Sequence, residues 1–207
     1  MAYVIFDVGA NWGVDSLSRT QNNTEVKTWA FEPTPYLVTY LINSSKEFND
    51  RYHVVPLAVS DFNGVAKFNI AIGFDWGCSS LNTFNHGLDE TWPGRSDFKV
   101  NDVINVEVTR LDSWFNLNKP DIQQIDFFHC DTQGSDLKVL QGMGEYLKLI
   151  KEGVVECPTS ERSKLYIENH SFEEMKNFLD LNGFFITSIV PNDIHNNEVN
   201  VYFKNKI

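Results

Sequence analysis

The segment Asp7–Gly13, which follows a short apolar run at the start of the chain, is the feature that most constrains the fold. The run Tyr3–Phe6 is apolar throughout and stops at an aspartate, as expected of a central strand that is buried on both faces. Gly9 and Gly13 then leave the backbone of the turn open to close approach by a ligand or a neighbouring strand. A helix expected over 12–18 would direct its first N–H groups at the same place, which suits a carboxylate. The segment therefore predicts a strand–turn–helix unit with a ligand at the turn, or a glycine turn that only packs a helix on a sheet.

The rest of the chain repeats this alternation of apolar runs and helical patterns. Strands are expected over 27–31, 52–59, 65–72, 103–109, 125–130, 154–157, 184–190 and 199–204. Helices are expected over 36–48, 111–115, 135–140 and 172–181. Alternation of this kind predicts an α/β fold, in which helices flank a parallel sheet.

Length and charge narrow the class of protein. The 207 residues are enough for one domain over 1–207 with a sizeable core. A net charge of −11 with no basic run argues against a nucleic-acid partner. The first apolar run is too short for a signal peptide or a membrane span, so no membrane partner is expected. Three cysteines without a C-x-x-C pair indicate reduced thiols and a cytoplasmic location. The sequence leaves a monomer and a homodimer equally open.

Glu32 ends the second predicted strand, 25 positions after Asp7. An acidic residue at the tip of the next strand can accept hydrogen bonds from both ribose hydroxyls of an adenosine-containing cofactor. Asn11 stands where dinucleotide-binding turns place their second glycine, and the final two strands have no helix between them. Both features favour S-adenosylmethionine over a nicotinamide cofactor, and carboxylates near the site suit the sulfonium cation of S-adenosylmethionine. A nicotinamide-dependent oxidoreductase is the alternative.

Five stretches of the chain resemble the FkbM-type methyltransferases, in the order found in that family. They are V-I-F-D-V-G-A-N-W-G, A-F-E-P-T-P, L-A-V-S-D-F-N-G, R-L-D-S-W and I-D-F-F-H-C-D-T-Q-G-S-D-L-K-V-L-Q-G. The resemblance implies a Rossmann-like class I methyltransferase fold: a mostly parallel seven-stranded sheet with helices on both faces and an antiparallel C-terminal strand. It also implies methyl transfer from S-adenosylmethionine to oxygen, on a sugar, a polyketide or another small hydroxylated acceptor.

The same resemblance implies a set of cofactor-binding residues. Asp7, Gly9, Asn11, Gly13 and Glu32 would bind the cofactor, with Ser60 and Asp61 near its adenine. The predicted cofactor site also includes their neighbours and the aspartate of the last stretch, namely Ala10, Trp12, Ser16, Pro33 and Asp131.

The chain departs from the family in that last stretch. Where the family reads K-I-D-x-E-G, this chain reads His129-Cys130-Asp131-Thr132-Gln133-Gly134. His129 and Asp131 are expected on one face of a strand. Either could take the proton from an acceptor hydroxyl, and Asp131 is the preferred candidate. A non-catalytic module that keeps the fold and cofactor pocket is therefore another alternative.

The acceptor side is predicted from the segment 73–101, which is rich in Gly, Asn, Trp and Ser and has no clear period. A loop of this length inside a compact domain is uncommon and is often functional. We expect it to be an acceptor-binding lid that contributes Trp76, Ser79 and Ser80; an irregular excursion covering the sheet edge is the alternative. Glu156 ends a strand and could bind an acceptor hydroxyl. His129, Asp131 and Glu156 lack metal-ligand spacing, so no metal is expected.

Overall fold

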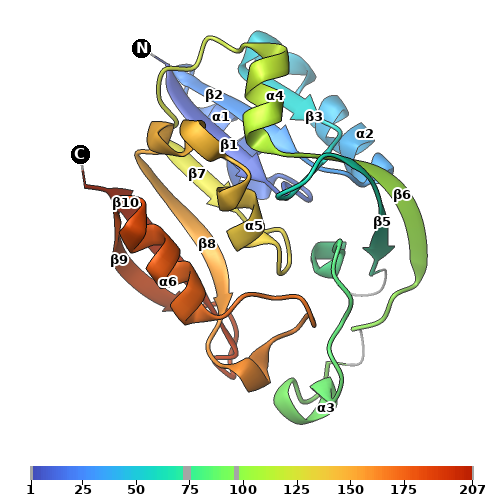
Figure 1. Cartoon of the computed structure of the whole chain (residues 1–207). Coiled ribbons are helices and arrows are strands. Elements are labelled where there is room, and N and C mark those ends of the chain that lie inside the picture. Colours follow the sequence, from blue (N-terminus) through green and yellow to red (C-terminus); the bar gives the residue numbers. More distant parts are fainter. Residues whose placement is uncertain (1, 72–75, 96–97, 207) are drawn as a thin grey trace.

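A seven-stranded sheet forms the centre of the computed structural model, which describes residues 2–71, 76–95 and 98–206 (Figure 1). Its strands are β1 (Tyr3–Val8), β2 (Val26–Phe31), β3 (Tyr52–Val55), β7 (Phe127–Cys130), β8 (Glu152–Pro158), β9 (Phe184–Pro191) and β10 (Glu198–Asn205). They are arranged in the order β3-β2-β1-β7-β8-β10-β9. Only β10 runs against its neighbours, antiparallel to both β8 and β9. The predicted mostly parallel sheet with an antiparallel C-terminal strand is confirmed.

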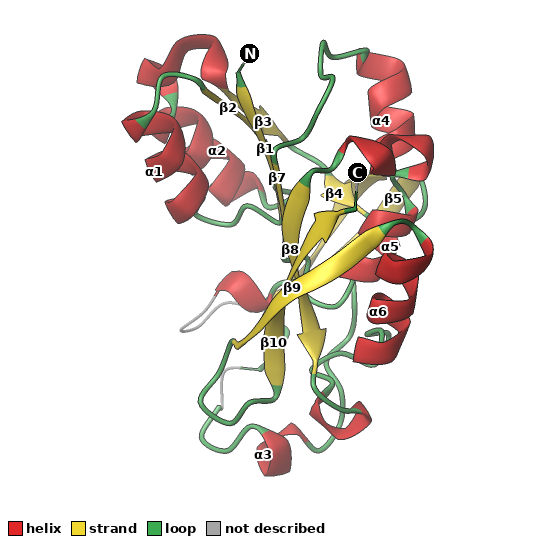
Figure 2. Ribbon diagram, turned by 90° about the vertical axis from the view of Figure 1, so that its left-hand side faces the viewer, coloured by secondary structure: helices red, strands yellow, loops and turns green. Residues whose placement is uncertain are grey.

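Helices cover both faces of this sheet (Figure 2). On one face lie α1 (Val14–Asn22) and α2 (Pro35–Ser44). On the other lie α4 (Leu111–Asn118), α5 (Asp136–Gln141) and α6 (Phe172–Leu181). Short 3-10 helices occupy Lys46–Arg51, Trp76–Cys78, Gly144–Leu149 and Glu161–Ser163. The helix α6 has the predicted bounds because the Ser171 hydroxyl and the Glu174 carboxylate cap its first turn reciprocally.

The largest core lies between the sheet and the helices α4–α6. Phe6 of β1 is fully buried there, stacked on Phe115 of α4 at a centroid distance of 5.6 Å. Phe31 and Phe128, from the strands on either side of β1, contact the same ring at 5.6 and 6.4 Å. Many of the chain's phenylalanines therefore serve packing, which fixes β1 and its neighbours as a rigid base for the turns at their carboxyl ends.

A second, three-stranded sheet lies beside the first. It consists of β4 (Ala58–Val59), β6 (Asp102–Thr109) and β5 (Gly64–Ile70), in that order, with β5 antiparallel to β6. The prediction of one strand over 52–59 is wrong, because the run divides at Pro56 into β3 and β4. Proline has no N–H to donate to a strand ladder, and the chain changes sheet there.

Three other predicted boundaries differ. The helix expected over 12–18 begins at Val14 and extends to Asn22, and the one expected over 36–48 changes to a 3-10 helix after Ser44. The segment 73–101 is not wholly irregular, since its described part holds a 3-10 turn and α3 (Leu88–Thr91). Residues 72–75 and 96–97 lie outside the described part of the chain.

Candidate active site

The turn between β1 and α1 passes directly against the end of β7. A Cβ on Gly9 would lie 1.9 Å from the carbonyl oxygen of Asp131, so no side chain fits there. Gly9, Asn11 and Gly13 all have positive φ, at 82°, 50° and 61°. Glycine adopts this region without steric cost, and asparagine tolerates it better than most residues. The local sequence thus permits a tight loop that brings backbone N–H groups to the carboxyl edge of the sheet.

Glu32 joins this loop to the end of β2. One carboxylate oxygen accepts a hydrogen bond from the backbone N–H of Asn11 at 2.9 Å, and the other from that of Thr34 at 2.8 Å. The side chain is buried, and burial raises its pKa while these donors partly offset the shift. A carboxylate has about four lone-pair sites, so two remain for ligand hydroxyls.

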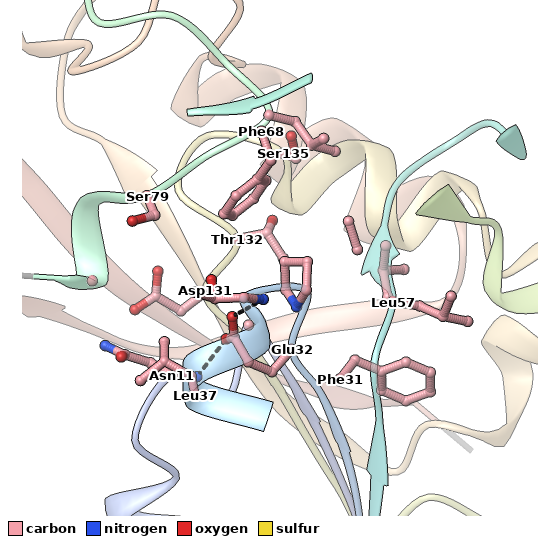
Figure 3. A pocket seen from close by; sticks show the side chains of 17 residues that line it. Asn11, Phe31, Glu32, Leu37, Leu57, Phe68, Ser79, Asp131, Thr132 and Ser135 are labelled. Carbon is pink, nitrogen blue, oxygen red and sulfur yellow. Dashed lines mark hydrogen bonds between the residues drawn. The ribbon is translucent and has the colours of Figure 1, made fainter. Parts of the chain in front are cut away.

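The cavity in front of Glu32, called here the Glu32 cavity, has a volume of about 500 Å³ including its open mouth. Figure 3 shows Glu32 and Asp131 facing it from different strands. Its polar floor comes from Gly9, Asn11 and Glu32, and an apolar wall comes from Leu57, Val59 and Phe68. Ser79 and Ser135 lie at its far side. A nucleoside needs such a pairing of hydroxyl acceptors with an apolar slot.

A second cavity, called the His129 cavity, is lined by the loop 9–16 together with Asp7, Phe127, His129 and Asp131. Asp7, at the end of β1, is buried and lies 2.8 Å from Nδ1 of His129 on β7. Burial alone would lower the pKa of His129, but the hydrogen bond and charge of Asp7, with the charges of Asp131 and Asp136, raise it to about 9. The imidazole is therefore protonated at neutral pH.

A third cavity, called the Glu156 cavity, opens beyond the ends of β7 and β8. Four acidic residues line it: Asp131, Glu156, Asp193 and Glu198. The described part of segment 73–101 adds Trp92, Arg95 and Phe98 to the lining. The Arg95 guanidinium stacks on Phe98 at 4.3 Å, and Trp92 meets the same ring edge-on at 5.5 Å. A lining that combines polar acceptors with aromatic rings suits a hydroxylated ring.

Carboxyl groups around the Glu156 cavity are strongly perturbed. Burial, and then the charge of Asp131, raises the pKa of Glu156 well above its ordinary value. The same two causes raise the pKa of Glu198 to about 8 and that of Asp136, at the start of α5, to about 7. Groups whose pKa values are shifted by burial and a specific charged neighbour are typical of functional sites.

Asn11 and Asp131 line all three cavities. The side-chain oxygen Oδ1 of Asn11 is buried and has no hydrogen-bond partner among the described residues. A buried acceptor without a donor costs free energy unless a ligand supplies the donor. The junction of the three cavities is therefore the place where two ligands would meet.

Most predicted cofactor residues meet at this junction. Residues of the β1–α1 turn line the His129 cavity, including Ala10, Trp12, Gly13 and Ser16, and Pro33 lines the Glu32 cavity. The Ser16 hydroxyl lies 2.9 Å from that of Tyr52. Ser60 and Asp61 lie outside all three linings: Ser60 is buried against Gly142, and Asp61 is exposed. Their predicted place near an adenine stays a prediction.

Some of the predicted acceptor residues line a cavity and others do not. Ser79 lines the Glu32 cavity, and Glu156 lines the Glu156 cavity. Ser80 is buried and donates to the carbonyl of Gln133 at 2.6 Å, so its hydroxyl is used inside the protein. The side chain of Trp76 lies outside what the structure describes.

Several residues of the Glu156 cavity are absent from the predicted site, among them Trp92, Arg95 and Glu198. No local pattern marks them, since each reaches the cavity from a distant part of the chain. Gln133 stands where the family has a glutamate, and this difference in the sequence could have placed Gln133 in the site.

Within residues 2–71, 76–95 and 98–206, no group of three or more His, Cys, Asp or Glu side chains could hold a metal ion. No helix in that part of the chain is both long and apolar enough to cross a bilayer.

Comparison with known proteins agrees with this geometry. The sequence model of the Methyltransferase FkbM domain matches residues 7–186. The 2-O-methyltransferase NoeI of Sinorhizobium fredii is 28% identical over 150 residues, which are 70% of this chain and 58% of NoeI. The match thus spans little more than half the length of that relative.

Solved structures share the fold at low sequence identity. A fibrillarin/Nop5p complex superposes with a TM-score of 0.54 at 11% identity, over 98% of this chain and 72% of that one. The magnesium protoporphyrin IX methyltransferase of Synechocystis PCC 6803, solved with bound S-adenosylmethionine, gives 0.53 at 9% identity, over 99% and 70%. TrmK of M. capricolum, solved with S-adenosylhomocysteine, gives 0.51 at 13% identity, over 99% and 62%.

These structures share the fold of this chain, and the family match covers most of its length. The chain belongs to the FkbM family of S-adenosylmethionine-dependent methyltransferases.

Proposed function

We propose that this chain transfers the methyl group of S-adenosylmethionine to a hydroxyl oxygen of a sugar or another small hydroxylated acceptor. The observation that carries the proposal is the junction at Asn11 and Asp131, which joins two cavities suited to a cofactor with one suited to a hydroxylated ring. The name of the relative NoeI, a 2-O-methyltransferase, supports oxygen as the methyl acceptor.

The residues present fit the cofactor. Glu32 would hold the ribose hydroxyls, and the slot between Leu57, Val59 and Phe68 would take the adenine. The methionine part would lie along the β1–α1 turn, where backbone N–H groups and the protonated His129 suit its carboxylate. The unpartnered Oδ1 of Asn11 would accept a hydrogen bond from the cofactor. When bound, S-adenosylmethionine supplies an electrophilic methyl group on a sulfonium cation.

The acceptor would enter the Glu156 cavity, with its reacting hydroxyl beside Asp131. Transfer of the methyl group to the hydroxyl oxygen would release S-adenosylhomocysteine, with the electrons of the broken carbon–sulfur bond on sulfur. The Asp131 carboxylate would take the hydroxyl proton. His129 cannot accept that proton at neutral pH, because it is already protonated and bound to Asp7.

A matched pair of variants tests this assignment. Asp131→Asn should lower kcat by roughly 10²-fold or more, because it removes the base, while S-adenosylhomocysteine affinity stays within severalfold. Asp121→Asn is the control, since Asp121 is exposed and lines none of the three cavities. Turnover is measured as S-adenosylhomocysteine release with methyl glycosides and small polyols as acceptors. Unchanged turnover in Asp131→Asn would refute Asp131 as the base.

The same assay separates the competing functions. A non-catalytic module would bind S-adenosylhomocysteine tightly yet methylate none of the acceptors. The proposal also includes a cytoplasmic location, supported by three buried cysteines that are thiols rather than disulfides. It includes a small-molecule or glycan acceptor rather than nucleic acid, supported by the net charge of −11.

A further inference from the structure

Gln133 occupies the space between the two carboxylates at the centre of the site. Its side-chain nitrogen Nε2 donates to Oδ1 of Asp131 at 2.7 Å and to Oε2 of Glu156 at 3.2 Å. An amide nitrogen carries two hydrogens, one for each carboxylate. The other oxygen of Glu156 accepts from the side-chain amide of Asn192. A single neutral side chain thus connects the end of β7 to the end of β8.

The opposite end of the Gln133 amide is fixed as well. Its oxygen Oε1 lies 2.9 Å from the hydroxyl of Tyr166, a fully buried side chain whose hydroxyl also lies 2.8 Å from the carbonyl of Cys78. Two carboxylates can only accept, so their contacts place the amide nitrogen on their side, while the single hydrogen of the Tyr166 hydroxyl is shared between Oε1 and the Cys78 carbonyl.

The backbone of Gln133 is held in an unfavourable conformation. Its φ is 55°, in the left-handed region that side-chain-bearing residues rarely adopt. The carbonyl of Gln133 accepts from the Ser80 hydroxyl at 2.6 Å and from the Asn82 amide at 3.1 Å. The segment 80–82 therefore holds the backbone in place. Strain retained by its surroundings in this way is found mainly at functional sites.

The electrostatic surroundings show what this bridge does. Asp7 and His129 approach Asp131 from β1 and β7, Asp136 from α5, Glu156 from β8 and Glu198 from β10. Asp193 lies in the turn before β10, and Arg95 reaches the cavity from the described part of segment 73–101. Acidic side chains dominate, so the Gln133 amide between Asp131 and Glu156 offsets their repulsion whenever both are charged.

We propose that Gln133 is a positioning residue: by donating to Asp131 and Glu156 together, it holds the Asp131 carboxylate directed at the acceptor hydroxyl. The inference rests on the proposed function, in which Asp131 accepts the proton. Gln133 acts through Asp131, to which it donates, and does not itself take the proton. Its role requires a neutral side chain with two hydrogens at this length, which glutamine alone among the natural residues provides.

Three variants test the role. Gln133→Met keeps the length and removes both donors, whereas Gln133→Glu also adds a third carboxylate. Gln123→Glu is the control, because Gln123 is exposed, lines none of the three cavities, and donates to Asp121 at 3.4 Å. Both Gln133 variants should lower kcat about tenfold or more, with S-adenosylhomocysteine affinity within severalfold of the wild type. The thermal midpoint of each variant shows that it is folded.

The pH profile separates positioning from a merely structural role. The acid limb of kcat/KM should move to higher pH in Gln133→Glu, because added negative charge makes the carboxylates easier to protonate, and should move less in Gln133→Met. Unchanged kcat and pH profile in both variants, with an active wild-type enzyme, would overturn the role of Gln133 and leave the proposed function standing.

A second measurement needs no activity. Crystal structures of the wild type and Gln133→Met, each with S-adenosylhomocysteine, should show the Asp131 carboxylate rotated away from its wild-type direction in the variant. The same carboxylate direction in both structures would overturn the inference even if no acceptor is methylated, an outcome that would separately reject the proposed function.

Discussion

At the scale of single residues, the site depends on how closely the turn after β1 approaches the end of β7. Gly9 has a φ of 82°, and a Cβ there would meet the Asp131 carbonyl at 1.9 Å. Gly87, which precedes α3, has a similar φ of 71° but nothing within 4 Å of a built Cβ. Alanine at both positions would adopt a left-handed backbone, but only alanine at Gly9 would also collide with a neighbour. Comparing the two variants therefore separates the two contributions to the loss of folding stability.

Gly9→Ala and Gly87→Ala should differ accordingly. Gly87→Ala pays only the left-handed conformation, about 1 kcal/mol of folding free energy, and keeps cofactor binding. Gly9→Ala also displaces the turn from β7, so its loss of stability should exceed about 3 kcal/mol, with a marked loss of S-adenosylhomocysteine affinity. Urea unfolding and calorimetry measure the two effects. Equal stabilities and affinities in the two variants would show that the close approach at Gly9 is unimportant.

Residues that directly follow a buried strand were predictable from sequence. Asp7, Glu32 and Asp131 each end an apolar run, and parallel strands bring such ends to one edge. Gln133 could be noticed but not interpreted, because its partners Glu156 and Tyr166 are distant in the chain. Ser60 was expected near the adenine, and this stays a prediction. In the structure Leu57 and Val59 line the Glu32 cavity, because the chain changes sheet at Pro56.

At the scale of elements, the acidic cluster follows from strand direction. Glu156 lies near the carboxyl end of the parallel strand β8, and Glu198 begins β10, which is antiparallel to it. The amino end of β10 therefore lies at the same edge as the carboxyl end of β8. The final strand pair could be predicted from the missing helix between its members. Which side chain it would deliver to the site depended on register, which periodicity does not give.

The acidic side chains that meet at this edge of the sheet should make folding stability fall as pH rises from about 6.5 to about 9. The pKa of Glu198 is raised to about 8 and that of Asp136 to about 7, whereas unfolded carboxyls lose their protons near pH 4. The raised pKa of His129, about 9 against about 6.5 when unfolded, acts in the same direction. The folded state therefore holds more protons across this range, and stability declines as they are lost.

Thermal midpoints or urea unfolding at several pH values check the sign. Glu198→Gln is the matched variant: it removes one buried carboxyl, so its stability should decline less steeply than that of the wild type. A stability that is constant or increases between about pH 6.5 and about pH 9 would contradict the account of the cluster.

At the scale of the whole molecule, the cofactor side and the acceptor side of the site come from different parts of the fold. The parallel half of the sheet, with its phenylalanine core, supplies Asp7, Gly9 and Glu32 for the cofactor. The acceptor side combines the ends of β8 and β10 with the described part of segment 73–101. That segment has no period to read, and its short helices are stabilised by tertiary contacts, so its arrangement could not be predicted from sequence. Whether it acts as a lid stays a prediction.

Calorimetry with S-adenosylhomocysteine and NAD, on the wild type and Glu32→Ala, tests the central claim most directly. The account predicts that S-adenosylhomocysteine binds the wild type with one site per chain, that Glu32→Ala weakens this binding by about tenfold or more, and that NAD gives no binding heat. Binding of NAD in preference to S-adenosylhomocysteine, or an affinity for S-adenosylhomocysteine that does not depend on Glu32, would contradict it.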